Sequence, residues 1–272
     1  MDDKLNLITG SEGFIGKALQ KKIEAERLDK KLYSQLCLDL EKTTSIELRR
    51  NWETVFHLAA NPDIRTNDFS KDINITRNLL EQLTDFKGTF IFTSSSTVYG
   101  NAIHIPTRED DGPFLPISLY GASKLAIEGL VSAYAEKYGF KFKILRLANV
   151  VGKGCHGIVP DLIQKLRSDS KYLELFGDGN QRKSYIHIDE CVEKILHSLK
   201  TKGQVFNIGS SDSIDVFEVA EIAMKETGIR KEIKFTQGWL GDVKLMQLDC
   251  EKLGYPLRSS AASVRDAIRE NL

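Results

Sequence analysis

The chain has no excess of either charge, although more than a quarter of its 272 residues are charged. Its 38 lysine and arginine side chains are balanced by 38 aspartate and glutamate side chains. Without a net field, bulk electrostatic attraction to DNA, RNA or an anionic membrane surface is excluded as its means of binding. We therefore expect no nucleic-acid or membrane partner, and any anionic ligand must be bound by a local set of donors.

The chain is also poor in cysteine and in long apolar runs. Its four cysteines, Cys37, Cys155, Cys191 and Cys250, form no C-x-x-C pair and no zinc-type spacing with histidine. We expect reduced thiols, no metal site and a cytoplasmic location. No apolar run approaches the roughly 18 to 20 residues that span a bilayer, and the first structural pattern begins near Lys4, so we also expect no signal peptide.

The first half of the chain alternates strand and helix patterns. Apolar residues at three- and four-residue spacing predict an amphipathic helix over 14–26. Strands are predicted over 5–9, 32–40, 54–60, 89–94 and 141–147. Strands separated by helices favour an α/β fold, a doubly wound parallel sheet of the Rossmann type.

The second half of the chain has a different rhythm. Short strands are predicted over 185–188 and 205–208, and helices over 189–199 and 216–227. We expect residues 1–150 to form a dinucleotide-binding domain that also carries the catalytic residues. Residues 151–272 would form a smaller, mixed α/β substrate-binding lobe, interwoven with the first. A cleft between the two lobes is the predicted ligand site.

A glycine-rich turn, T-G-S-E-G-F-I-G, follows the first predicted strand and opens the first helix. Gly10, Gly13 and Gly16 leave the backbone N–H groups open to a pyrophosphate, which the helix dipole also attracts. An acidic residue further along usually binds the adenine ribose, and Asp39, 23 residues beyond Gly16, is the candidate. This arrangement predicts a dinucleotide cofactor.

Tyr120 and Lys124 stand four residues apart in Y-G-A-S-K, on one face of a predicted helix. Such a lysine can lower the pKa of the phenol, which would make the tyrosine a usable base near neutral pH. The hydroxyls of residues 94–96 follow an apolar strand, at the end where parallel sheets bind ligands. They could bond a substrate hydroxyl beside the tyrosine, although composition alone favours an ordinary turn formed by serine and threonine side chains.

The order of these motifs resembles the extended short-chain dehydrogenase/reductase superfamily, and within it the compact NAD-dependent UDP-glucose 4-epimerases. The resemblance covers almost the whole length and rests on T-G-x-x-G-F-I-G, H-L-A-A, T-S-S-S-T-V-Y-G, Y-G-A-S-K, L-R-x-A-N-V-V-G, G-D-G-x-Q-x-K-S-Y and G-W-x-G-D-V-K. It implies NAD as the cofactor and a UDP-hexose as the substrate. It also implies a homodimer formed through the helices that follow Ser70 and Tyr120.

The resemblance implies roles for individual residues. Tyr120 would take the proton of the sugar 4-hydroxyl, Lys124 would lower the pKa of Tyr120 and hold the nicotinamide ribose, and Ser95 would be the hydroxyl partner. The implied cofactor contacts are Gly10, Gly13, Phe14, Ile15, Gly16, Asp39, Leu40, Leu58, Ala59, Ala60, Tyr120, Lys124 and Ala148. The implied substrate contacts are Ser95, Asn149, Phe176, Lys183 and Asp242.

Two features depart from the pattern of many relatives. Lys183 and Trp239 stand where arginines often bind the substrate diphosphate, which leaves Lys183, Arg182 and backbone donors for that task. The segment between the first helix and Val55 is short and has one good strand candidate. The choice between NAD and NADP therefore stays open. So does the choice between Asp72 and Asn74 for a polar position beside the cofactor.

The sequence thus predicts reversible 4-epimerisation of a UDP-hexose, UDP-glucose or UDP-galactose first, by transient oxidation to a 4-keto sugar. One alternative is an NAD(P)H-dependent reductase of a 4-keto nucleotide sugar, and another is a non-catalytic NAD-binding protein. A 4,6-dehydratase is disfavoured because Ser96 and Thr97 stand where its relatives carry an acid/base pair. The identity of the hexose, and whether N-acetylated sugars fit, are open.

Overall fold

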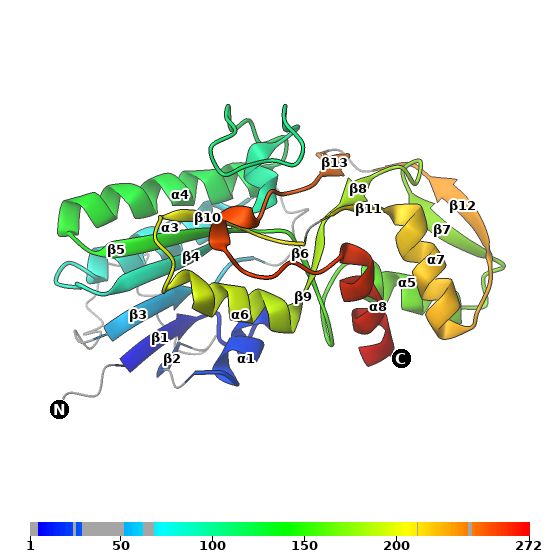
Figure 1. Ribbon diagram of the computed structural model, residues 1–272, viewed down its shortest axis with the longest axis horizontal. Helices are drawn as coiled ribbons and strands as arrows, with labels where there is room; N and C mark the ends of the chain where they lie inside the picture. Colours follow the sequence, from blue (N-terminus) through cyan, green and yellow to red (C-terminus); the bar gives the residue numbers. More distant parts are fainter. Residues whose placement is uncertain (1–4, 24–25, 29–51, 62–67, 211, 239–240) are drawn as a thin grey trace.

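The computed structural model describes residues 5–23, 26–28, 52–61, 68–210, 212–238 and 241–272 (Figure 1). The strand predicted over 32–40, and with it the candidate cofactor residues Asp39 and Leu40, lies outside the described residues. Trp239 lies outside them too.

The larger part of the molecule is built on a six-stranded sheet in the order β10-β5-β4-β3-β1-β2. Each neighbouring pair of strands is parallel. Its strands are β1 (Leu5–Thr9), β2 (Glu26–Leu28), β3 (Trp52–His57), β4 (Thr89–Ser95), β5 (Lys141–Leu147) and β10 (Val205–Ile208). The strand order reverses between β1 and β3, so the carboxyl ends of these two strands open onto one crevice.

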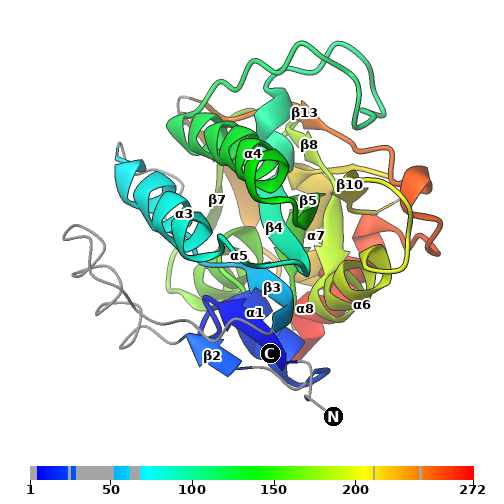
Figure 2. The same ribbon diagram turned by 90° about the vertical axis from the view of Figure 1, so that its left-hand side faces the viewer.

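Helices cover both faces of this sheet, which confirms the predicted doubly wound fold (Figure 2). The helices are α1 (Phe14–Gln20) and α6 (Ile188–Ser198) on one face, and α3 (Ser70–Gln82) and α4 (Leu119–Tyr138) on the other. Successive strand side chains point to opposite faces: Phe90 packs under α3 and α4, whereas Ile91 packs under α1 and α6. Because both faces are covered, apolar residues stand next to one another in the middle of the strands, as do Phe90, Ile91 and Phe92 of β4.

The helix predicted over 14–26 is wrong in its length. It ends at Gln20, where the backbone N–H of Lys21 turns back onto the carbonyls of Ala18 and Leu19. Ile23 still packs against the core from the turn, so the apolar spacing continued beyond the helix itself. The chain then enters β2, which pairs with β1 several residues earlier than the predicted second strand.

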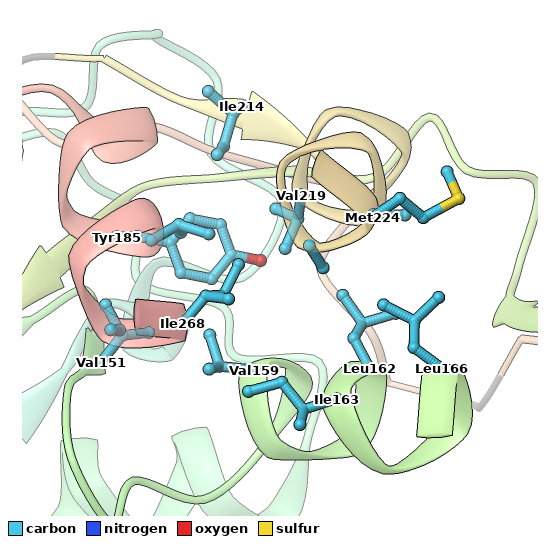
Figure 3. Close-up of a cluster of buried hydrophobic side chains, with 14 of the residues drawn as sticks. Val151, Val159, Leu162, Ile163, Leu166, Tyr185, Ile214, Val219, Met224 and Ile268 are labelled. Carbon is cyan, nitrogen blue, oxygen red and sulfur yellow. The ribbon is translucent and has the colours of Figure 1, made fainter. Parts of the chain in front are cut away.

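The smaller lobe is mixed α/β. Its strands are β6 (Asn149–Val151), β7 (Tyr172–Phe176), β8 (Arg182–Lys183), β9 (Tyr185–His187), β11 (Ile214–Asp215), β12 (Glu232–Thr236) and β13 (Leu245–Met246). Its helices are α5 (Ile158–Arg167), α7 (Val216–Thr227) and α8 (Ser260–Glu270). Of two short 3₁₀ turns, η1 (Ser96–Tyr99) directly follows β4 of the large sheet, and η2 (Glu251–Leu253) contacts β10 and α6. Figure 3 shows the apolar core where α5, α7 and α8 meet, with Val159, Leu162, Val219 and Ile268 pointing toward one another.

The chain passes between the two parts of the molecule more than once, so each part is built from separate stretches of sequence. β10 and α6 come from the predicted second lobe, yet β10 pairs with β5 and α6 packs on the large sheet. The division at residue 150 stays a prediction, as does the homodimer, although α3 and α4 do lie side by side (Figure 2). In the described part of the chain, no helix has the length and apolar character that a bilayer span requires.

Candidate active site

A large cleft runs along the carboxyl ends of the parallel strands and continues against the smaller lobe. Its volume of about 2280 Å³ exceeds the roughly 300–1,000 Å³ typical of a site for one small molecule. Fifteen of the predicted site residues line it: Gly10, Gly13, Phe14, Ile15, Gly16, Leu58, Ala59, Ala60, Ser95, Tyr120, Lys124, Ala148, Asn149, Lys183 and Asp242. Residues far apart in sequence therefore meet in one place, as the position of their motifs at strand ends predicted.

The glycine turn between β1 and α1 is packed so closely that side chains cannot be added. Gly10 has a φ of 70°, and a Cβ there would lie 2.8 Å from the backbone of Ala59. A Cβ on Gly16 would collide with the carbonyl oxygen of Gly10. The turn and the end of β3 thus form a bare backbone cradle, which fits the pyrophosphate of a dinucleotide.

The three predicted catalytic residues come together at the end of β4. Ser118 begins α4 by accepting a hydrogen bond from the N–H of Gly121 at 3.1 Å, and this places Tyr120 in the first turn. The side chain of Ser95 faces the phenol of Tyr120 and acts to lower its pKa. One turn further, the buried Lys124 donates from Nζ to the carbonyl oxygen of Thr93 at 3.0 Å.

The structure does not show the expected lowering of the Tyr120 pKa by Lys124. Burial raises the pKa of Tyr120 to about 12, and the charge of Asp72 adds to this rise while the bond to Ser95 opposes it. Burial also lowers the pKa of Lys124 to about 8, so its ammonium is partly discharged near neutral pH. Desolvation therefore outweighs the attraction that the sequence pattern suggested, because it penalises the charged form of both groups.

Asp72 is an acidic residue of the site whose role the sequence left open. Its side chain is 6% exposed, and both carboxylate oxygens accept from the N–H of Asn61, at 2.9 and 3.1 Å. Burial raises its pKa. Asn74, the other candidate, is exposed, although it also lines the cleft. Asp72 thus ties α3 to the loop after β3 and adds a carboxylate that acts on Tyr120 and Lys124.

His57 lies beneath the site and was overlooked as a functional position within H-L-A-A. Its ring nitrogens are hydrogen-bonded to Thr9 Oγ1 at 2.7 Å and Thr76 Oγ1 at 2.8 Å. Burial, and then the charge of Lys124, lower its pKa to about 3, so the ring is neutral. His57 therefore links β1, β3 and α3 at the floor of the cleft.

The two cations expected near the substrate diphosphate, Lys183 and Arg182, are already paired. Lys183 forms an ion pair with Asp242, and both line the cleft. Arg182 pairs with Asp215 at 3.1 Å and is not among the described residues that line the cleft. Of the groups expected near a diphosphate, Lys183 is thus the cation that faces the cavity, and Asp242 shares its charge.

Phe176 is not brought into the cleft. In β7, Leu173 and Leu175 point into the core of the smaller lobe, so the alternation of a strand turns Phe176 outward. Its side chain is 54% exposed and lies under the ammonium of Lys165, 4.7 Å from the ring centroid. The apolar run L-E-L-F could be read as lining a ligand site, but half of it serves the core.

The chain is similar to solved nucleotide-sugar enzymes over nearly its whole length. A UDP-galactose 4-epimerase structure is 33% identical, covers 97% of both chains and superposes with a TM-score of 0.84. A UDP-glucuronic acid 4-epimerase from Bacillus cereus, in complex with UDP-glucuronic acid and NAD, is 25% identical. It covers 97% of this chain and 98% of its own, with a TM-score of 0.82.

Curated relatives include more than one activity. A UDP-glucose 4-epimerase of Lacticaseibacillus casei is 31% identical over 59% of this chain and 54% of its own. A dTDP-4-dehydro-6-deoxyglucose reductase of Escherichia coli is 29% identical over 81% of this chain and 82% of its own. Residues 6–209 match the model of the NAD dependent epimerase/dehydratase family. On this match, and on the site just described, the chain belongs to the NAD dependent epimerase/dehydratase family.

Proposed function

We propose that this enzyme interconverts UDP-hexoses by epimerisation at the 4-position, with UDP-glucose and UDP-galactose as the first substrates to test. The observation that carries the proposal is the meeting of Ser95, Tyr120 and Lys124 at the strand end that faces the glycine cradle. The UDP-galactose 4-epimerase structure, similar over the full length, supports the choice of reaction.

The cofactor of this family is NAD, and the bare backbone of Gly10, Gly13 and Gly16 fits its pyrophosphate. When bound, NAD supplies a reversible acceptor for a hydride. Leu58, Ala59 and Ala60 line the cleft beyond the cradle, where they would contact the dinucleotide. Lys124 would hold the nicotinamide ribose from α4.

Tyr120 is the base in the proposed reaction, and Ser95 holds the substrate hydroxyl beside it. Ser95 Oγ accepts from the N–H of Thr97 at 3.3 Å and from Thr97 Oγ1 at 3.0 Å, so its own proton is free to be shared with Tyr120 or the sugar. Because the pKa of Tyr120 is about 12 without ligands, the proposal requires this pKa to fall when the cleft is filled.

The hexose must turn over between the two hydride steps, while the nucleotide stays bound. Around Tyr120 the cleft is lined by small side chains, among them Ser95, Thr97 and Ala148. The ion pair of Lys183 and Asp242 and the side chain of Asn149 lie on the wall formed by the smaller lobe. This distribution supports a loose grip on the sugar and a firmer one on the diphosphate and nucleoside.

The direct test is conversion of UDP-galactose without added cofactor, followed by separation of the products. Tyr120→Phe should reduce kcat about 1,000-fold. Tyr134→Phe is the matched control, because Tyr134 lies on the same helix and its hydroxyl bonds Glu81 on the outer surface, at 3.1 Å. A Tyr120→Phe protein that epimerises UDP-galactose at the normal rate would refute the assignment.

A net reductase of a 4-keto nucleotide sugar is the second candidate, favoured by the Escherichia coli relative. The two candidates differ in how the cofactor is held, since an epimerase recycles its NAD and a reductase exchanges NAD(P)H. Nucleotide released by heating freshly purified protein separates them: co-purified NAD(H) supports the epimerase, and an empty site supports the reductase.

Dehydration of the sugar finds no support in the residues after Ser95. Ser96 Oγ donates to the sulfur of Met246, and Thr97 Oγ1 donates to Ser95. Neither side chain is an acid at neutral pH, whereas elimination of water needs an acid/base pair at this place.

A further inference from the structure

Behind the catalytic residues lies a buried ion pair that does not touch the cleft. Glu128 on α4 and Arg146 on β5 have side chains only 7% and 4% exposed. Arg146 donates from Nη2 to Glu128 Oε2 at 2.8 Å and from Nε to Oε1 at 3.0 Å, which is a bidentate contact. Neither residue is among the described residues that line the cleft.

Three successive residues at the end of β4, Thr93, Ser94 and Ser95, face side chains of α4, and Glu128 of the ion pair contacts the middle one. Lys124 Nζ donates to the carbonyl oxygen of Thr93, and the phenol of Tyr120 faces the side chain of Ser95, which acts to lower its pKa. Between them, Ser94 Oγ donates to Glu128 Oε1 at 2.5 Å. Glu128 is one turn beyond Lys124, so it holds the middle residue of the three and sets how α4 lies along β4.

The other side of Arg146 is bonded to the loop that leads to Tyr120. Its Nη1 donates to the carbonyl oxygen of Glu109 at 2.9 Å and to the hydroxyl of Tyr99 at 3.0 Å. The Glu109 carboxylate accepts from the N–H of Asn207 at 2.8 Å, and Tyr99 donates to Asn207 Oδ1 at 2.7 Å. From β5, the Arg146 guanidinium therefore contacts α4 and the segment 101–118 directly, and it is linked to β10 through Tyr99 and Glu109.

Stability alone is a weak reason for such a pair. Two charges lose their hydration on burial, and apolar residues of similar volume often give an equally stable or more stable protein. What apolar residues cannot supply is the directional bond to Ser94 or the bonds to Tyr99 and Glu109. These directional bonds therefore indicate that the pair positions its neighbours in addition to any effect on stability.

We propose that Glu128 and Arg146 are positioning residues for the reaction of the proposed function: they fix α4 against β4 so that Tyr120 and Lys124 meet Ser95 in reactive alignment. They act through Ser94 and touch neither substrate nor cofactor. The kinetic part of this proposal rests on the proposed function, whereas its geometric part does not.

The first test replaces the pair by apolar residues, Glu128→Leu with Arg146→Met. We expect kcat to fall about 100-fold, the cost of a small misplacement of reacting groups, with KM within about threefold. The control replaces a second buried pair, Glu190→Leu with Lys194→Met, whose atoms lie 2.7 Å apart on α6, away from the catalytic residues. It should keep kcat, and a Glu128→Leu/Arg146→Met protein that folds and keeps kcat within about twofold overturns the proposal.

Ser94→Ala covers the case in which the double variant does not fold. It leaves the ion pair intact and removes its bond to β4, so kcat should fall about tenfold, together with a modest fall in the unfolding temperature from the lost bond to a buried charge. An unchanged kcat in Ser94→Ala would count against the proposal as firmly as an active double variant.

The second test reads the site without substrate or cofactor. NMR titration of protein labelled with ¹³C at the lysine ε carbon gives the pKa of Lys124, which the charges of Asp72 and Glu128 hold up against burial. His57 and Tyr120, which also lie beside it, are neutral. The double variant should lower this pKa, and the Glu190/Lys194 control should not. If the wild type converts no nucleotide sugar, the proposed function fails while this titration still decides the role of Glu128.

Discussion

Lys124 and Tyr120 lie one turn apart on α4, with Nζ of Lys124 5.8 Å from the ring centroid of Tyr120. The ammonium is bonded to Thr93 rather than to the phenol oxygen. Lys124 therefore does not lower the pKa of Tyr120 in this structure, because burial keeps the phenol protonated and favours the neutral amine. Burial thus has the largest effect on the pKa of both side chains.

Tyr120 in the ligand-free protein should titrate late. Its pKa of about 12 lies above the ordinary value of 10.0. The unfolded chain ionises first, so the stability that the neutral phenol contributes is present below pH 10 and is lost as the pH rises toward 12. The ultraviolet absorbance of phenolate, compared between wild type and Tyr120→Phe, measures this pKa. A step near pH 10 assigned to Tyr120 would contradict the prediction.

His57 should make the fold sensitive to mild acid. Its pKa of about 3 lies below the ordinary 6.5, so the unfolded chain binds a proton that the folded protein refuses. The free energy of unfolding should therefore decrease as the pH falls from about 6.5 toward 3. Urea unfolding at pH 7 and pH 5 checks this, and His57→Gln should weaken the difference between the two values. An equal pH dependence in the variant would assign the effect to other groups.

Asp72→Asn should make the catalytic base easier to ionise. The amide oxygen still accepts from the N–H of Asn61, but the charge that raises the pKa of Tyr120 is removed. The rising limb of the pH profile of kcat/KM should move to lower pH, since Tyr120 then loses its proton earlier. Glu81→Gln, on the same helix and at the surface, is the control. A limb that stays in place would show that Asp72 does not act on Tyr120.

Two glycine substitutions should affect different properties: Gly16→Ala the affinity for NAD, and Gly129→Ala the stability of the fold. Gly16→Ala places a Cβ against Gly10 and 2.8 Å from Ser11 Cα, so it should disrupt the cradle and weaken NAD binding at least about tenfold. Gly129→Ala on the exposed side of α4 meets no atom within 4 Å, and it should stabilise the protein by about 1 kcal/mol. Calorimetric titration with NAD and thermal unfolding measure the two effects. If Gly16→Ala binds NAD as tightly as the wild type does, the glycine turn is not part of the cofactor site.

Much of the site could be predicted because its motifs stand where parallel strands end. The turn after β1, the alanines after β3 and the serines after β4 all reach one edge of the sheet, since parallel strands point the same way. The end of α1 could not be predicted, because Ile23 keeps the helical spacing from a turn. Phe176 was expected in the cleft, and strand alternation turns it outward.

The sequence by itself determined the doubly wound fold, the glycine cradle and the meeting of Ser95, Tyr120 and Lys124 at one strand end, because local pattern and strand direction are enough to place them. Only the tertiary structure decided the charge states of Tyr120 and Lys124, the burial of Asp72 and the pairing of Glu128 with Arg146. These depend on how much water each group loses and on partners that lie up to 52 residues away, such as Asp72 from Lys124. Desolvation and long-range pairing have no local signature, which is why the chemistry of the site became clear only in the folded chain.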